Sequence, residues 1–598
     1  MPSRTSTILL AGVLGFASTT SQVMVIRELL VAFTGNELTI ALTLAIWLLA
    51  VGAGSLLAGR APLAAARMVP GLMITAGLAS VAQVLAIRLI VPWVSGFGQL
   101  VTPPALAVLS AVGILPCAVT FGALFVGLVA RASTSGFGRP IAAIYGSEAV
   151  GSAVAGVALA AFLLEASSPI AVAAVAALVL VAGAAWMVGN WHGHAGVARR
   201  VLPVCGLLGL GLVLAAGGRL DLATRGAQWR PLKVVATADS KYGSLVVTGS
   251  DSIFQFFETG TLTFTVPDLR YAEECAHLPL LCHPAPRSVL VLGGAGSGIV
   301  EEVLKHPSVK QVDFVELDPR VISIVKELAP RGWLEGNAHT AVRAYSGDAR
   351  EFTARARTAY DVVIVGAGMP TSLLINRYYT REFFRSIRKV LAPDGVVAVK
   401  LASPGASVSP EMAELVASVR NALGAVFPNT AMLPGDYVHI LASPSLDVGA
   451  QARLVMERLH ARELHPAFVN QYVLWDWLAP IRVAQLDSIV GSYDHGEINS
   501  DDKPVAFALA LSLWEKQMAG AHGFLSPPRG LGLVGCVILL VVLSLLVIGF
   551  FAVGCRVPAS ALGPLVMVYT VGLLTMFTQV LIIVAFQIAS GYIYGRIA

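Results

Sequence analysis

Long apolar segments recur through the first third of the chain and return near its end, and they constrain the fold more than any other feature. At about 1.5 Å per residue, each is long enough to cross the hydrocarbon core of a bilayer as a helix. Charged residues make up only 13% of the 598 residues, which is about half the share usual in soluble domains. The predicted spans are 7–33, 38–59, 68–93, 105–130, 141–164, 170–189, 201–217, 530–553 and 562–589. The sequence therefore predicts a polytopic α-helical membrane protein, with about seven helices in residues 1–218 and about two in residues 526–598.

Ionisable residues fall inside these predicted spans, namely Arg27 and Glu28 in the first and Glu148 in the fifth. Charged side chains in the hydrocarbon region of a bilayer are unfavourable, so they usually pair with one another or line a polar path. Two interpretations stay open. The residues form a polar path or substrate site between helices, or they form ion pairs that fix helix packing.

The arginines of the predicted loops bear on the orientation of the protein. They gather in alternate loops, at Arg4, Arg60, Arg67, Arg131, Arg139, Arg199 and Arg200. The positive-inside rule places these loops and the N-terminus in the cytoplasm. Seven crossings would then place the following polar region outside the cytoplasm, whereas six would keep it inside. The sequence predicts a multi-pass protein of a bacterial-type inner membrane and leaves the side of the polar region open.

The apolar segment at 562–589 resembles the first predicted helix, since TQVLIIVAFQIASGYIYG can be set beside SQVMVIRELLVAFTGNEL. It either begins a second membrane repeat or is similar by chance. In the first case a partner membrane chain or a second copy of the protein would supply the remaining helices. The lipid bilayer is the other expected partner. The sequence contains no long basic run, so nucleic acid is not an expected partner.

Between about residues 219 and 525 charged residues appear, and short strand-like and helix-like patterns alternate. Val289–Leu292 predicts a buried parallel strand, and a second strand ends at Glu316. The loop after the first strand contains Gly293, Gly294, Gly296 and Gly298. Glycines let a backbone approach a ligand closely, and an acid at the end of the second strand can accept hydrogen bonds from a ribose diol. The pattern predicts a nucleoside-binding α/β domain.

Several ordered motifs make residues 237–401 resemble the spermidine synthase family, the polyamine aminopropyltransferases, which have the class I SAM-methyltransferase fold. The motifs are the loop GGAGSG, the strand end VELD, the turn SGDA and the stretch RYYTREFFRSIRKVLAPDGVVAVKL. The resemblance implies a small β-subdomain at 219–270 and a Rossmann-like domain at 271–525. It implies that the glycine loop, Glu316 and Asp348 bind S-adenosylmethionine or decarboxylated S-adenosylmethionine, with Glu316 on the ribose and Asp348 on the adenine amine. The residues alone leave a second interpretation, in which each acid only caps the next helix.

The chain departs from the family's pattern at three positions that have lost an acid. Gly296 stands where the family's glycine loop has an aspartate. Gly366 stands for the aspartate that binds and deprotonates the attacking amine, and Met369 for the aspartate before the proline. An attacking amine needs a free lone pair, and a carboxylate is the natural base for it. Losing all three acids argues against ordinary aminopropylation of putrescine.

Asp268, Tyr271 and Lys400 are the remaining catalytic candidates near the predicted crevice, and Lys400 stands where the family tends to have a neutral amide. This less acidic set suits a neutral or anionic acceptor. The six cysteines are scattered without a CxxC pair, so no metal site is expected. Two functions remain. The protein is a membrane-embedded transferase that uses a SAM-type nucleoside with altered acceptor chemistry, or it carries a catalytically inactive scaffold or sensor domain on a transporter-like or complex-assembly membrane subunit.

Overall fold

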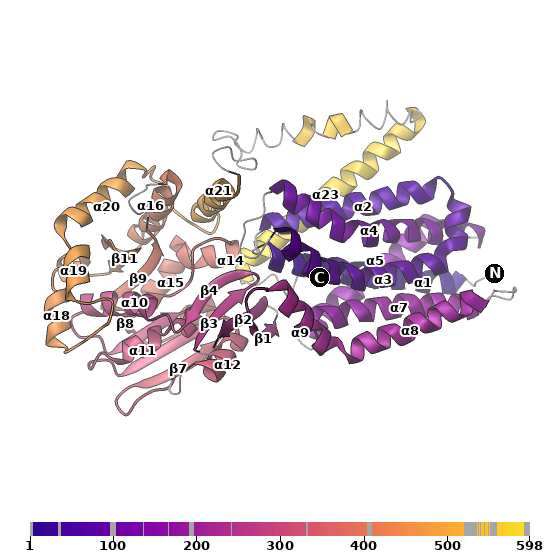
Figure 1. Cartoon of the computed structure of the whole chain (residues 1–598). Coiled ribbons are helices and arrows are strands. Elements are labelled where there is room, and N and C mark those ends of the chain that lie inside the picture. Colours follow the sequence, from indigo (N-terminus) through magenta and orange to yellow (C-terminus); the bar gives the residue numbers. More distant parts are fainter. Residues whose placement is uncertain are drawn as a thin grey trace.

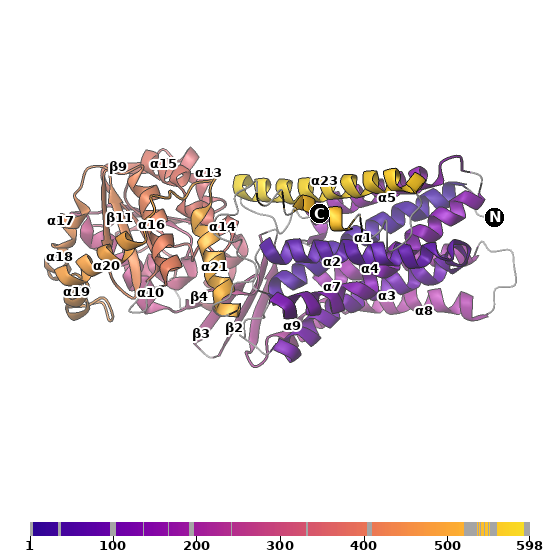
Figure 2. The ribbon, with the colours of Figure 1, turned by 90° about the horizontal axis from the view of Figure 1, so that it is seen from above.

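The computed structural model describes most of the chain. The described residues are 4–33, 37–95, 103–135, 137–164, 167–189, 197–240, 242–250, 252–329, 333–403, 409–519, scattered positions between 535 and 549, and 559–590. A helical bundle and a mixed α/β domain lie end to end, with the N-terminus at the end of the bundle that is farther from the α/β domain (Figure 1). A view from above shows the same arrangement (Figure 2).

The bundle is built from the apolar N-terminal segments. Its helices are α1 (Arg4–Ala32), α2 (Glu37–Gly59), α3 (Pro62–Ser95), α4 (Pro103–Thr134), α5 (Pro140–Ala158) with a π-turn (Leu159–Leu163), α7 (Pro169–Gly189), α8 (Val197–Ala215) and α9 (Gly217–Gln228). Within the described residues, six helices are long and apolar enough to cross a membrane. The predicted span 201–217 corresponds to α8, whose end bends by 73° into α9, and this pair makes a seventh crossing only if it counts as one broken span.

Small residues allow the first and fifth helices to pack backbone against backbone. A Cβ atom on Gly15 would lie 2.0 Å from the carbonyl oxygen of Glu148, and one on Gly151 would lie 1.9 Å from that of Gly12. Such contacts are impossible for any larger residue without moving the helices apart. The helix predicted at 141–164 therefore packs closely against the first predicted helix. Small residues commonly form such close interfaces between membrane helices.

The α/β domain contains two sheets. A four-stranded antiparallel sheet has the order β1 (Val234–Asp239), β2 (Ser244–Ser250), β3 (Ile253–Glu258) and β4 (Thr261–Val266). A seven-stranded sheet has the order β10-β11-β9-β8-β5-β6-β7. Its strands are β5 (Ser288–Leu292), β6 (Gln311–Glu316), β7 (Ala341–Ser346), β8 (Tyr360–Val365), β9 (Leu391–Ala402), β10 (Asn429–Leu433) and β11 (Tyr437–Ser443). Strand β11 pairs antiparallel with both β10 and β9, and the other neighbouring strands pair parallel. The larger sheet belongs to the predicted Rossmann-like domain, and the four-stranded sheet precedes it in the chain, after helix α9.

Helices cover both faces of the larger sheet. They are α10 (Leu269–Cys282), α11 (Ile299–Leu304), α12 (Pro319–Leu328), α13 (Ala349–Arg355), α14 (Leu373–Asn376), α15 (Arg381–Val390), α16 (Pro410–Gly424), α17 (Val448–Ala452), α18 (Val455–Ala461), α19 (Gln471–Trp477), α20 (Pro480–Ser492) and α21 (Val505–Ala519). Two 3₁₀ turns lie at Ala295–Ser297 and Arg377–Tyr379. Strands β5, β8 and β11 are nearly continuous buried runs, whereas the edge strand β7 is largely exposed.

The C-terminal helix α23 (Ala559–Ser590) contains the predicted span 562–589 and contacts α14 of the α/β domain. The predicted span 530–553 falls mostly outside the described residues. The glycine turns at the ends of the two similar segments, Gly35 and Gly591, also lie outside them. The proposed internal repeat therefore stays a prediction.

A buried network of charges joins the bundle to the small sheet. Glu28 of α1 accepts two hydrogen bonds, of 2.7 and 2.8 Å, from Arg88 of α3. Arg88 also donates to Asp221 of α9, at 2.8 Å. Asp221 in turn accepts from Arg225, at 2.8 Å, and Arg225 pairs with Asp239 of β1. All five side chains are at most 12% exposed, so the network is inside the protein.

Arg27 also belongs to this network, because its guanidinium lies 3.6 Å from the Asp239 carboxylate. The structure thus places Arg27 and Glu28 in ion pairs at the junction of the two parts of the chain. Glu148 lies apart from them, in the helix pair formed by α1 and α5.

Candidate nucleotide-binding site

The carboxyl ends of four parallel strands meet at one edge of the larger sheet. Leu292 at the end of β5 pairs with Val315 of β6 and Val365 of β8, and Glu316 pairs with Ser346 of β7. Backbone hydrogen bonds join the loops that follow: Gly293 to Val315, Gly347 to Glu316 and Gly366 to Leu292, at 2.8 to 2.9 Å. The residues predicted from separate motifs therefore come together in the crevice where open α/β sheets bind ligands.

The glycine loop has the backbone conformation that its sequence predicts. Gly293, Gly294 and Gly298 have φ angles of 76°, 71° and 94°, which residues with a Cβ atom rarely adopt. The Ser297 hydroxyl donates to the Gly294 carbonyl at 2.6 Å and closes the turn. The loop thus turns sharply between the end of β5 and the start of α11.

Two acids follow the second strand of the crevice. Glu316 Oε1 accepts a hydrogen bond from the Leu317 amide at 2.9 Å. Asp318 caps α12 through the Arg320 amide at 2.9 Å, and its other oxygen accepts from Ser240 at 2.5 Å. A cavity of about 410 Å³ opens beside them. It is lined by Asp239, Ser240, Tyr242, Asp318, Pro319, Arg320 and Ser346.

Glu258 at the end of β3 adds a third carboxyl group to this region. Burial, together with the negative charges of Glu316 and Asp318, raises the pKa of Glu258 to about 8. A carboxyl group with this pKa carries a proton at neutral pH and can donate a hydrogen bond. Sequence reasoning missed Glu258, because it lies in the small sheet and meets the crevice only through the fold.

Asp348 both caps a helix and holds an arginine. Its Oδ1 accepts from the Arg350 amide at 2.7 Å, so the capping interpretation holds for this residue. Its Oδ2 accepts from Arg377 at 2.7 Å. Each carboxylate oxygen has two lone pairs, so these contacts leave acceptor capacity for an adenine amine.

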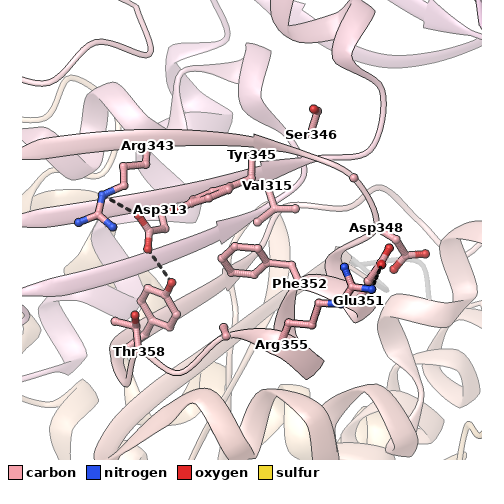
Figure 3. Close-up of a pocket in the computed structure, with 13 residues that line it drawn as sticks. Asp313, Val315, Arg343, Tyr345, Ser346, Asp348, Glu351, Phe352, Arg355 and Thr358 are labelled. Atoms are coloured by element: carbon pink, nitrogen blue, oxygen red, sulfur yellow. Dashed lines mark hydrogen bonds and ion pairs between the residues drawn. The ribbon is translucent and has the colours of Figure 1, made fainter.

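A second cavity, of about 350 Å³, extends from Asp348 across the inner side of β6, β7 and α13. Asp313, Arg343 and Thr358 lie at its far end, and Phe352 and Tyr345 lie between (Figure 3). The Tyr360 hydroxyl donates to Asp313 at 2.6 Å. This cavity and the one beside Asp318 share Ser346 in their linings, so they flank the turn after β7.

The two glycines that replace family acids have neighbours that leave no room for a side chain. A Cβ atom on Gly296 would lie 2.0 Å from the ring of Phe264, which stacks on Phe256 at 4.5 Å. A Cβ atom on Gly366 would lie 2.7 Å from the Gly293 carbonyl oxygen. The third position, Met369, packs against the apolar core, and its sulfur accepts from the Ala402 amide at 3.2 Å. A side chain at either glycine would therefore require its neighbours to move.

The three catalytic candidates lie together near Gly366. Asp268 caps α10 by accepting from the Tyr271 amide at 3.1 Å. The Tyr271 hydroxyl donates to the Gly366 carbonyl at 3.3 Å. The Lys400 Nζ lies 3.2 Å from the centre of the Tyr271 ring and 3.7 Å from that of Tyr437. Burial lowers the pKa of Lys400, while the Cys275 thiol and the Glu274 carboxylate act in the opposite direction.

One cluster of potential metal ligands lies among the described residues, at His283, Asp361 and Asp394. It is at the amino end of β8, away from the crevice. His283 Nδ1 accepts a hydrogen bond from the Ala285 amide at 3.2 Å. In the neutral ring the proton then sits on Nε2, which faces Asp394 at 3.8 Å. The histidine therefore presents a proton to the acids rather than a lone pair to a cation.

Comparisons with known proteins match this geometry. The family model described as spermine/spermidine synthase domain matches residues 268–437, which include the glycine loop, Glu316, Asp348 and Lys400. Polyamine aminopropyltransferase 1 of Streptomyces coelicolor is 30% identical over 393 residues, covering 62% of this chain and 71% of that protein. The chain belongs to the polyamine aminopropyltransferase family.

Other members of the aminopropyltransferase family match a shorter stretch. The polyamine aminopropyltransferase of Bacillus cytotoxicus is 35% identical over 164 residues, which cover 27% of this chain and 56% of that protein. The chain thus spans about half the length of such curated relatives. A spermidine synthase in complex with the transition state analogue AdoDATO superposes with a TM-score of 0.35 at 21% identity, covering 44% of this chain and 89% of that one.

Proposed function

We propose that the protein is a multi-pass membrane protein whose Rossmann-like domain binds S-adenosylmethionine or decarboxylated S-adenosylmethionine and transfers a group from it to an acceptor other than a diamine. The observation that carries the proposal is the meeting of the glycine loop, Glu316 and Asp348 at one sheet edge, within the region that matches the family. Group transfer is the activity that the relatives' names state.

The crevice fits a nucleoside on three counts. The left-handed glycines let the backbone approach the sulfonium end of a ligand. Glu316 would accept from both ribose hydroxyls, and Asp348 would accept from the adenine amine. The space next to the Gly347 Cα is open, with nothing within 4 Å of a Cβ position. Bound there, the sulfonium nucleoside supplies an activated carbon, and the protein's own groups bind and orient it.

The acceptor side of the crevice departs from what a diamine needs. A diamine acceptor is a dication that requires carboxylates as ligands and as a base. Gly296, Gly366 and Met369 supply none, and their packing excludes acids at the two glycines. Lys400 adds a cation beside Gly366. A neutral or anionic acceptor suits this side, and a membrane-borne acceptor would account for the fusion to the apolar bundle.

The proposal requires a supply of nucleoside, which exists in the cytoplasm. One observation favours the second function, a non-catalytic scaffold or sensor domain outside the cytoplasm. Arg4 contacts Ser135 and Ala65 approaches Gly127, so the N-terminus and the α2–α3 and α4–α5 loops gather at one end of the bundle. Val31, at the other end of α1, meets Gly260 of the small sheet. The arginine-rich end is thus opposite to the α/β domain.

Binding measurements test the proposal directly. The full-length protein in detergent is titrated by calorimetry with S-adenosylmethionine, decarboxylated S-adenosylmethionine and methylthioadenosine. We expect at least one to bind, and Glu316→Ala/Asp348→Ala to weaken it by on the order of 100-fold, because each acid would accept charged hydrogen bonds. Asp447→Ala, which removes an exposed helix cap on α17, is the matched control. Absence of binding to all three nucleosides would contradict the proposal.

Reporter fusions near residue 525, after the end of α21, distinguish the two functions. A reporter that is active only in the cytoplasm supports the transferase. A reporter that is active only outside would exclude a reaction dependent on S-adenosylmethionine and favour the scaffold or sensor.

A further inference from the structure

The surroundings of Lys400 have the composition of a binding site for an alkylammonium ion. Two tyrosine rings face the Nζ at 3.2 and 3.7 Å, and their centres lie 6.1 Å apart with the ring planes at 86°. Aromatic faces attract cations because of their negative quadrupole, most strongly where water is excluded. Lys400 is 7% exposed, so this pair of rings forms a buried aromatic cage.

A buried carboxylate stands behind the rings. Glu274 is fully buried, and His439, which pairs with Lys400 across β9 and β11, lies 3.3 Å from its Oε2. Oε1 of Glu274 lies 3.6 Å from Arg270 and makes no hydrogen bond within the described part of the chain. The negative charges of Glu274 and Asp268 both favour a cation at the Lys400 position. The Lys400 ammonium thus lies between two aromatic rings, with the negative charges of Glu274 and Asp268 nearby.

Within the part of the chain that the structure describes, no oxygen or nitrogen atom accepts a hydrogen bond from the Lys400 Nζ, and the Cys275 thiol is its hydrogen-bonding neighbour. A buried ammonium with three donors normally finds acceptors, because leaving them unpaired is unfavourable. Apart from the weak thiol contact, Lys400 is held by rings and charge, which is how an aromatic cage holds a ligand. Its side chain is a four-carbon chain ending in an ammonium, so it has the shape of a bound n-butylammonium ion.

The cage lies between the crevice and the surface. The register pairs Val399 with Val365, which places Lys400 level with Gly366 on the neighbouring strand. The Tyr271 hydroxyl touches the Gly366 carbonyl, so one ring separates the cage from the crevice. On the outside, an ion pair between Arg270 and Asp436, which are 53% and 42% exposed, covers Glu274.

We propose that the rings of Tyr271 and Tyr437, with Glu274 behind them, form a binding site for a primary alkylammonium ion, and that Lys400 occupies this site as a tethered ligand and excludes alkyl amines and diamines. This inference rests on the proposed function, because it assigns to one residue the exclusion of a diamine acceptor. It also makes Lys400 a specificity-determining residue rather than a general base.

Cavity complementation tests the proposal. Lys400→Ala in the full-length protein should leave a channel of the shape of n-butylammonium between the rings. We expect n-butylammonium and putrescine to raise the thermal unfolding midpoint of Lys400→Ala and to bind it at least about ten-fold more tightly than they bind the wild type. n-Butanol, which has the same chain without the charge, should have no such effect.

Two further variants keep the test decisive. Lys400→Ala/Tyr437→Ala removes one ring and should lose the binding that Lys400→Ala gains. Lys400→Arg keeps a cation between the rings and should behave like the wild type. If Lys400→Ala does not fold, Lys400→Gln, whose shorter neutral chain stops before the rings, is titrated with ethylammonium instead.

The outcomes separate the two proposals. Nucleoside titration of the same variants reports on the proposed function. Charge-dependent binding by the Lys400 variant supports the cage whether or not a nucleoside binds. Equal binding of n-butylammonium by the wild type and Lys400→Ala, or equal effects of n-butylammonium and n-butanol, would overturn it.

Discussion

Ser240 donates a 2.5 Å hydrogen bond to Asp318, the residue that caps α12 just beyond Glu316. The preceding residue, Asp239, pairs with Arg225 and Arg27 of the bundle. Burial alone would raise the pKa of Asp239, but the two arginines outweigh burial and hold it below its usual range. Two adjacent residues at the end of β1 therefore join the bundle to the ribose side of the crevice.

Replacing Ser240 by alanine should weaken nucleoside binding without unfolding the domain. The hydroxyl holds the Asp318 carboxylate in place, and a hydrogen bond to a charged group contributes about 1.5–3 kcal/mol. Losing it should displace Asp318 and, with it, the neighbouring Glu316, so that part of this energy is lost from nucleoside binding. We expect a loss of affinity of roughly three- to ten-fold by calorimetry. Ser323→Ala, which removes an exposed hydroxyl on α12, is the control. Unchanged affinity in Ser240→Ala would show that Asp318 holds its position without the serine.

Asp239→Asn should destabilise the whole protein. It leaves the Arg225 and Arg27 guanidinium groups, which are 3% and 1% exposed, without their shared counter-ion. Removing one partner of a buried pair costs about 3–5 kcal/mol, so the thermal unfolding midpoint in detergent should fall by several degrees. Asp476→Asn breaks an exposed pair with Arg482 and should change stability by less than about 1 kcal/mol. Equal effects of the two substitutions would contradict the importance of burial.

Gly366→Ala and Gly368→Ala should differ sharply, although the two glycines share one loop. A Cβ atom on Gly366 would meet the Gly293 carbonyl at 2.7 Å, whereas one on Gly368 has no atom within 4 Å. Overpacking against backbone costs about 1–3 kcal/mol, and it would displace the glycine loop. We expect Gly366→Ala to lower both the unfolding midpoint and nucleoside affinity, and Gly368→Ala to leave both unchanged. A tolerated Gly366→Ala would show that the loop can move aside.

Glu258→Gln should stabilise the protein progressively as the pH rises. The pKa of Glu258 in the folded state is about 8, raised from its ordinary value of 4.5. Between these values the folded state holds a proton that the unfolded state has released, so stability falls as the pH rises through this window. Glutamine keeps the neutral form at every pH. The difference in unfolding midpoint between Glu258→Gln and the wild type should therefore grow from pH 5 to pH 8, and a constant difference would contradict the raised pKa.

Local sequence patterns were enough to predict that the glycine loop, Glu316 and Asp348 meet at one edge of the sheet. The glycine loop, Glu316 and Asp348 each stand at a fixed place after a strand, and parallel strands end at one edge. The same reasoning could not find Tyr437 or Glu274. They reach Lys400 from an antiparallel strand and from α10, and no local spacing relates them to it.

The charged residues of the bundle show the same limit. The adjacent residues Arg27 and Glu28 are conspicuous in an apolar segment. Glu28 pairs with Arg88, however, and Arg88 pairs with Asp221, and both of these residues are distant from Glu28 in the sequence. The sequence could therefore indicate that these residues interact, and only the fold could show that they meet at the seam with the small sheet.

That seam has a consequence for biogenesis. Val31 and Trp229 of the N-terminal part pack against Val246 and Phe257 of the small sheet, and Asp239 pairs with Arg27 of α1 and Arg225 of α9. A polypeptide that began after α9 would expose this apolar patch and an unpaired buried acid. During synthesis the helices leave the ribosome before the strands, so an assembled bundle would provide the surface on which the small sheet, and after it the crevice, completes its folding.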